Sequence, residues 1–269
     1  MRRIPAGLWI IGGWCVLAIA GPWLVPYGAS ETNLELELAG PSAAHWLGCD
    51  ELGRDLLARV LAGARVSLLV SVPVVLISMT VGTAVGLWAG WRRGTWDFAL
   101  MRTVDLLQAF PGILLALGLA FVLGPSLINL IAAMSALGWV GYARLVRGQV
   151  LELREREFVQ AALVTGAGEL SVMVRHLLPN LYALLAVQGA FALGAAVLTE
   201  SSLSFLGLGI PGRPSWGSML DSGIDYLLIA PHVGLVPGAV LATAVLGFNL
   251  AGEALRDRLD VRIQSGERR

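Results

Sequence analysis

The chain has 269 residues, of which 56% are hydrophobic and only 14% are charged, with 19 acidic and 19 basic side chains. A soluble domain carries about a quarter charged residues, so this composition excludes an ordinary soluble protein and indicates a membrane protein. All of the basic residues are arginine. Because a P-loop needs a lysine at the nucleotide phosphates, any ATPase that drives this protein must be a separate subunit.

Long blocks without charged residues predict six transmembrane helices, because about 20 apolar residues span a bilayer. Gly124-Pro125 divides the longest block into two spans, and Pro111 predicts a kink in the first of these. The expected spans are 7–27, 66–91, 99–123, 126–147, 181–205 and 229–253. The sequence therefore predicts an all-α polytopic membrane protein with one transmembrane domain over residues 1–269, an outer loop at 28–65 and a cytoplasmic loop at 151–180.

The first apolar block follows Arg2-Arg3, which is also the pattern of a secretory signal peptide. No clear A-x-A cleavage site follows, and the block is long enough to span a membrane. We therefore expect an uncleaved first helix. Cys15 lies in this block and Cys49 in a polar segment, so we expect no structural disulfide between them.

The distribution of arginine predicts the orientation, because cytoplasmic loops carry an excess of basic residues. With the N-terminus in the cytoplasm, fifteen arginines lie inside and only four lie outside, namely Arg54, Arg59, Arg65 and Arg213. The opposite orientation reverses this bias. We therefore expect both termini and the loop 151–180 to be cytoplasmic.

The outer loop contains the stretch HWLGCDELGRD from His45 to Asp55. His45, Cys49, Asp50 and Asp55 suggest a metal site, but a site for a soft metal uses several thiolates or imidazoles, and this loop offers one of each. We favour a structured loop in which Arg54 is paired locally, and we expect no metal site.

Charged residues lie close to the inner ends of the third and fourth spans. Asp105 lies about one turn inside the membrane, and an acidic residue there is a candidate functional residue. We favour instead an ion pair with Arg102, three residues earlier on the same helix. Arg144 and Arg147 share one helix face, and we expect them to anchor the fourth span at the lipid headgroups.

The cytoplasmic loop contains two short helical patterns separated by Gly166-Ala167-Gly168, which is a turn signal. The first pattern runs from Glu152 to Val164. In the second, helical spacing predicts one apolar face, made of Leu170, Met173, Val174, Leu177 and Leu178. Pro179 is expected to end this pattern. Lipid, the protein's own spans or a soluble partner could each cover the apolar face.

Three polar residues stand out in the last two spans. Gln188 is the one amide of the fifth span, and Glu200 lies near its outer end, where it could face a transport pathway or mark the membrane interface. Asn249 in the sixth span favours a hydrogen bond between helices over a substrate contact. Trp216 suits a position at the membrane interface.

Several short stretches together resemble one known family. Gln160-Ala161-Ala162, Gly166 and His176-Leu177-Leu178-Pro179 are similar to the EAA loop of permease subunits of ATP-binding-cassette (ABC) importers. HWLGCDELGRD, GYARLVR, SLSFLGLG and PSWG resemble the dipeptide, oligopeptide and nickel branch of that family. The likeness covers nearly the whole chain from Pro41 to Asp260. Gln160 and Cys49 depart from the Glu and Thr usual in that branch.

The resemblance implies a permease in the cytoplasmic (inner) membrane of a bacterium, with a cytoplasmic coupling-helix loop that docks on an ATPase. It implies four kinds of partner: a second homologous permease, two cytoplasmic ATP-binding subunits, an extracytoplasmic substrate-binding protein and membrane lipid, with no nucleic acid. ATP and Mg²⁺ would bind the ATPase subunits, and this chain would hold no cofactor and catalyse no reaction. The loop residues implied are Glu157, Gln160, Ala161, Ala162, Gly166, Glu169, Arg175, His176, Leu178 and Pro179.

We favour peptides as the transported solute, with nickel or another small solute of the same branch as the alternative. A stand-alone secondary carrier is a second class of function, but it needs coupling acids near the membrane midplane, and no apolar block has a central carboxylate. An intramembrane enzyme is a third class, and neither GxSxG nor HExxH occurs in the chain.

Overall fold

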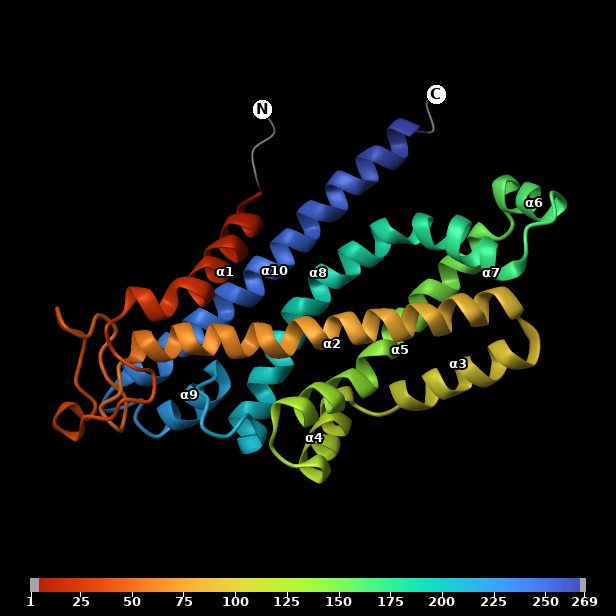
Figure 1. Cartoon of the computed structure of the whole chain (residues 1–269). Helices are drawn as coiled ribbons and strands as arrows, with labels where there is room; N and C mark the ends of the chain where they lie inside the picture. Colours follow the sequence, from red (N-terminus) through yellow and green to blue (C-terminus); the bar gives the residue numbers. More distant parts are fainter. Residues whose placement is uncertain (1–4, 267–269) are drawn as a thin grey trace.

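The computed structural model describes residues 5–266, and every regular element in that range is helical (Figure 1). The short elements are a 3₁₀ turn, Leu34–Leu36, and two π turns, Met173–Leu177 and Ser204–Leu208. The α-helices are α1 (Ala6–Leu24), α2 (Leu56–Arg92), α3 (Gly94–Gln108), α4 (Gly112–Leu123), α5 (Leu127–Leu153), α6 (Glu157–Val164), α7 (Glu169–Val172), α8 (Leu178–Leu203), α9 (Trp216–Ile224) and α10 (Pro231–Gly266).

Four stretches within the described residues are long and apolar enough to cross a membrane, namely α2, α5, Glu169–Leu208 and Pro231–Leu259. A fifth span results if α3 and α4 count as one. The apolar part of α1, Ala6–Gly21, is shorter. The predicted all-α polytopic membrane fold is confirmed, whereas the count of six spans stays a prediction.

The third predicted span, 99–123, is not one helix. α3 ends at Gln108, α4 begins at Gly112, and their axes differ by 87°. The predicted kink at Pro111 is therefore a complete break. Pro111 has a ψ of 116°, outside the helical range, and proline has no N–H to continue the backbone ladder.

The helix that contains the second predicted span begins at Leu56, ten residues before position 66, so the last part of the predicted outer loop 28–65 is helical. Asp55 explains the early start, because its side chain accepts a hydrogen bond of 2.7 Å from the N–H of Ala58 and caps α2. Arg59 and Arg65 therefore belong to the first turns of a helix of 37 residues. The other helices also differ from the expected bounds at one or both ends, most of all α10.

The centre of the molecule is the contact between α2 and α5. A side chain at Gly82 would lie 2.4 Å from the carbonyl oxygen of Trp139, and one at Gly86 would lie 2.6 Å from that of Ala143. Only glycine lets the two backbones come this close, as small residues do at helix contacts in membranes. This close contact is the frame on which the other helices pack.

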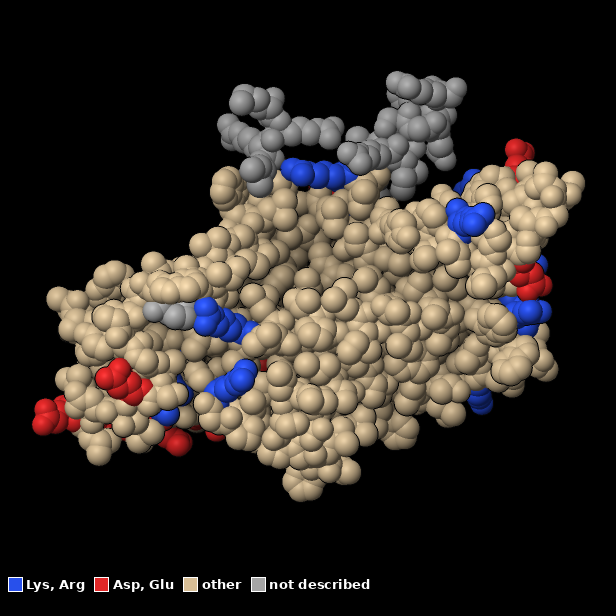
Figure 2. All heavy atoms as spheres, in the orientation of Figure 1, with Lys and Arg blue, Asp and Glu red and all other residues tan. Residues whose placement is uncertain are grey.

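The two ends of the molecule differ in character. α6, α7, the start of α1 and the end of α10 lie toward one side, and the loop before α2 lies toward the other together with α9 (Figure 1). Figure 2 shows charged side chains gathered near these two ends, with a broad uncharged surface over the middle of α2. An uncharged belt between two charged ends is the surface that a bilayer requires.

Candidate functional site

The first candidate site is the tip formed by α6 and α7. Its inner side chains are fully buried: Val159 on α6, Val172 on α7 and Leu177 in the π turn have no exposed surface. They join one apolar cluster with side chains of α2, α5 and α8, including Leu87, Val146, Val150, Leu181 and Leu185. The tip is therefore packed onto the inner ends of three long helices and can move with them as one body.

Polar contacts hold the tip to the α2–α3 turn and to the end of α5. Arg92 and Glu169 form an ion pair of 3.0 Å, and Arg154 donates a 3.0 Å hydrogen bond to the carbonyl of Trp91. Gln160 donates through its side-chain amide to the carbonyl of Arg154 at 2.8 Å. Gln160, where the family pattern has Glu, thus fixes α6 to the end of α5.

Gly166 makes the turn between α6 and α7. Its φ is +87°, which favours glycine because it has no Cβ, and its N–H donates to the carbonyl of Leu163 at 3.0 Å. Gly168 has an ordinary φ of −67° and precedes α7. The turn predicted from these glycines is present, and it depends on the first of them.

Two predictions about the second half of the loop are wrong. Pro179 does not end a helix, because the π turn Met173–Leu177 continues directly into α8. There the N–H of Leu178 donates to the carbonyl of Met173, five residues earlier, and Pro179 follows within the first turn of α8. The wider turn also divides the predicted apolar face, since Met173 and Leu177 are buried while Leu170 and Val174 are exposed.

The outer surface of the tip carries exposed apolar side chains among charged ones. Val164 is 87% exposed and Leu170 is 69% exposed, one at each side of the turn. Most of the loop residues singled out from the sequence are on this surface too: Glu157, Gln160, Ala161, Gly166, Glu169, Arg175 and Pro179 are exposed. The other three, Ala162, His176 and Leu178, are half-buried. The tip thus presents apolar side chains on a firmly supported base.

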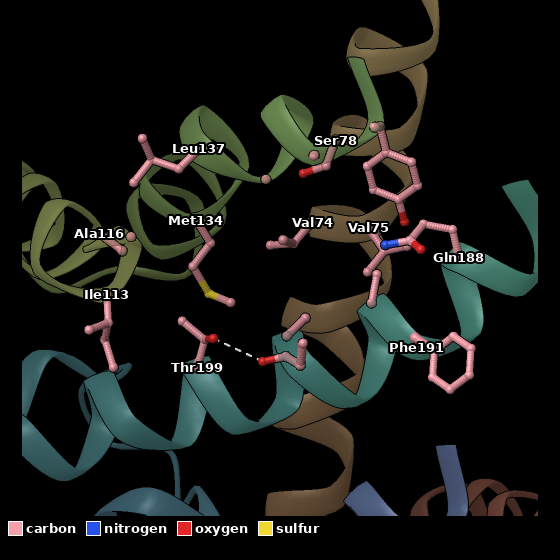
Figure 3. Close-up of a pocket in the computed structure, with 17 residues that line it drawn as sticks. Val74, Val75, Ser78, Ile113, Ala116, Met134, Leu137, Gln188, Phe191 and Thr199 are labelled. Carbon is pink, nitrogen blue, oxygen red and sulfur yellow. Dashed lines mark hydrogen bonds between the residues drawn. The ribbon is translucent and has the colours of Figure 1, made fainter. Parts of the chain in front are cut away.

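The second candidate site is a cavity of about 450 Å³ between α2, α4, α5 and α8 (Figure 3). Gln188 lines it, as do Ser78, Tyr142 and Thr199, and the other described lining residues are apolar or glycine. No carboxylate, arginine or histidine is among the described residues that line it. Sequence reasoning found Gln188 but missed Ser78 and Tyr142, because nothing in the sequence shows which face of a span points inward.

Glu200 is not among the described residues that line this cavity; of the roles considered for it (transport pathway, membrane interface or helix packing), its contacts are those of helix packing. Its side chain has no exposed surface and accepts hydrogen bonds from Ser67 on α2 at 3.1 Å and from Ser204 at 2.8 Å. A buried carboxylate needs such donors. Glu200 therefore joins α2 to α8. Asn249 is half-buried on α10, with its side-chain oxygen 4.0 Å from where a Cβ of Gly194 on α8 would lie.

Ion pairs join α3 to α5 and bear on the predictions made for Asp105 and for the two arginines of the fourth span. Asp105 pairs with Arg144 of α5, not with Arg102. Arg147 donates to Asp97 at 2.6 Å. The two arginines thus hold α3 against α5, a role beyond the headgroup anchoring expected of them. The helices run antiparallel here, because Arg144 meets the later aspartate and Arg147 the earlier one.

The outer loop is held by its own side chains. As predicted, Arg54 is paired locally, with Asp50 at 2.7 Å and Glu51 at 2.6 Å, while His45 pairs with Asp55 at 2.8 Å. Burial, with help from the two nearby aspartates, raises the pKa of the Cys49 thiol, which disfavours the thiolate that binds metals. Trp216 is buried in the protein and its indole N–H donates to the carbonyl of Val60 at 3.0 Å; its depth in the membrane stays a prediction.

Several long apolar helices, an uncharged cavity between them and a supported apolar tip at one end define the class as a membrane transport subunit. Residues 82–265 match the family described as binding-protein-dependent transport system inner membrane component. The chain belongs to this family and is therefore a multi-pass inner-membrane permease of an ABC importer, not an ATPase.

Named relatives agree with this assignment. The chain is 40% identical to the glutathione transport system permease protein GsiD of Pectobacterium atrosepticum, over 97% of this chain and 87% of that protein. It is 43% identical to the protein of the same name from Shigella dysenteriae, over 93% of this chain and 83% of that protein. Glutathione is a peptide-type solute, so the peptide class predicted from the sequence agrees with these names.

Proposed function

We propose that this permease imports small peptides, including solutes of the size of glutathione, and that nickel is not its substrate. The name shared by the relatives supports the peptide class. The chemistry of the cavity supports it as well, because its described lining offers hydroxyl and amide groups to a peptide and neither thiolate nor imidazole to a metal ion.

The proposal extends to the assembly. The permease pairs with a second, homologous permease around a shared pathway, receives its solute from an extracytoplasmic binding protein, and is driven by two cytoplasmic subunits that bind ATP and Mg²⁺. Both of its termini are cytoplasmic. The α6–α7 tip docks on one ATPase subunit, and because it is packed onto α2, α5 and α8, movement of the ATPase is passed to the helices around the cavity.

The exposure of Leu170 on a rigid base is the observation that carries the docking proposal. Leu34 in the outer loop is a matched control, because the two leucines are 69% and 68% exposed. In the co-expressed complex, we expect Leu170→Asp to reduce retention of the ATPase subunits by about tenfold or more, since a charge would be desolvated in the interface. Leu34→Asp should leave retention unchanged.

The solute is tested on the same complex in liposomes with its binding protein. We expect ATP hydrolysis to be stimulated by di- and tripeptides and not by Ni²⁺. Stimulation by Ni²⁺ alone would replace the peptide proposal with the metal alternative. Transport by the isolated permease without ATPases would contradict the proposed assembly and favour a secondary carrier. Equal retention of the ATPases by the two aspartate variants would contradict docking through the tip.

A further inference from the structure

Three helices bring polar side chains to the cavity. Ser78 comes from α2, Tyr142 from α5 and Gln188 from α8, and all three line it. Figure 3 shows Ser78 and Gln188 together on the right-hand side of the view, while Ile113 and Ala116 lie on the left. Ser78 and Gln188 therefore lie toward one end of the cavity, and Thr199 lies apart from them.

Two of these polar groups have no hydrogen-bond partner. The hydroxyl oxygens of Ser78 and Tyr142 are buried and make no hydrogen bond within the described structure, and the side chains are only 2% and 3% exposed. An unpaired buried hydroxyl is costly, and more so where lipid replaces water around the helices. Ser71, Thr83 and Ser135 also carry unpaired buried hydroxyls, but Ser78 and Tyr142 are the two of these groups that line the cavity, where a ligand could reach them.

The hydroxyl of Thr199 shows the contrast within the same cavity. Thr199 donates a 2.9 Å hydrogen bond to the carbonyl of Ala195, one turn earlier in α8, and this bond is the dashed line in Figure 3. This hydroxyl already has an acceptor and does not need one from a ligand. Among the described residues that line the cavity, the unpaired hydroxyls are thus those of Ser78 and Tyr142.

We propose that Ser78, Tyr142 and Gln188 form a transient site that hydrogen-bonds the backbone amides of a peptide during its passage. This inference rests on the proposed peptide import and adds the residues that contact the solute. Hydroxyls and a carboxamide can each donate and accept, and so match both the N–H and the C=O of a peptide bond. Because the described lining is uncharged, the site reads the peptide backbone and tolerates different side chains.

The test compares two solutes in the complete transporter reconstituted in liposomes. One is tri-alanine, and the other is the analogue in which the first of its two peptide bonds is replaced by an ester, which lacks one N–H donor. Both are supplied at concentrations that saturate the binding protein. With the wild-type permease, we expect uptake per ATP hydrolysed to be about fivefold lower for the ester, the effect of one neutral hydrogen bond.

The variants Ser78→Ala, Tyr142→Phe and Gln188→Leu should each lower tri-alanine uptake by a similar factor. At least one of them should abolish the difference between amide and ester, which a general packing defect would not do. Two variants serve as controls. Thr199→Val removes a cavity hydroxyl that already has a partner, and Ser135→Ala removes a buried, unpaired hydroxyl that is not among the cavity-lining residues. Ser135→Ala should transport normally, and Thr199→Val should keep the difference between amide and ester.

The outcomes separate this inference from the proposed function. If the wild-type complex takes up no peptide, peptide import itself is wrong. If peptide uptake is normal but the three cavity variants behave like the Ser135→Ala control, the transient site is wrong and peptide import stands. If the variants instead lose the second permease during purification, the hydroxyls bond the partner subunit, and the inference is overturned.

Discussion

Single residues decide how firmly the cytoplasmic tip is built. Gly166 and Gly168 lie two positions apart in the same turn, yet only Gly166 has a positive φ, of +87°. Neither glycine has a neighbouring atom that would collide with a Cβ, so backbone conformation alone distinguishes them. This difference is invisible in the sequence, which presents two similar glycines.

The pair gives a matched test. Proline holds φ near −65°, which conflicts with the +87° of Gly166 and removes the hydrogen bond to Leu163, but suits the −67° of Gly168. We expect Gly166→Pro to abolish peptide-stimulated ATP hydrolysis while membrane insertion is retained. Gly168→Pro should keep most of the activity. Equal loss in the two variants would show that the conformation of Gly166 is not what couples the tip.

At the scale of elements, ion pairs between helices set the position of α3. Arg147 and Asp97 are 32% and 14% exposed, whereas Arg144 and Asp105 are both about half-exposed. A charged hydrogen bond that is largely shielded contributes about 1.5–3 kcal/mol, and an exposed ion pair contributes about 1 kcal/mol or less. The less exposed pair, Arg147 with Asp97, therefore contributes more than the other pair to the attachment of α3 to α5.

Thermal unfolding in detergent measures this difference. We expect Arg147→Ala to lower the melting temperature clearly more than Arg144→Ala, because it leaves the shielded carboxylate of Asp97 without its partner. Exchanging the two residues, as Asp97→Arg with Arg147→Asp, should recover part of the loss, as a double-mutant cycle requires. A larger decrease in melting temperature from Arg144→Ala would contradict the conclusion that the more buried ion pair contributes more to stability.

For the whole molecule, the placement of its ends determines which surfaces meet which partners. Trp46, in the outer loop, and Leu170, at the α6–α7 tip, are both 69% exposed and lie toward opposite ends of the bundle. The asymmetry of arginine predicts that the tip is cytoplasmic. A docking surface for an ATPase requires this orientation.

Cysteine labelling in cells tests the orientation. In a background without Cys15 and Cys49, we expect Trp46→Cys to react with a membrane-impermeant maleimide on intact spheroplasts. Leu170→Cys should react only after the membrane is permeabilised. Because the two positions are equally exposed, accessibility through the membrane is the only difference between them. The reverse order of labelling would show that the topology is inverted and would rule out an ATPase at the tip.

The sequence by itself determined the class of this protein. Apolar blocks, arginine asymmetry and short motifs are local or one-dimensional properties, so they predicted a helical membrane permease with a cytoplasmic helix pair. Only the tertiary structure decided the rest. Four features depend on the rotation and spacing of helices: the burial of Glu200 against Ser67, the pairing of Asp105 with Arg144, the continuous helix through Pro179, and the presence of Ser78 and Tyr142 in one cavity. The rotation and spacing of the helices are set by close contacts such as that of Gly82 in α2 with the backbone of α5, which join residues far apart in the chain.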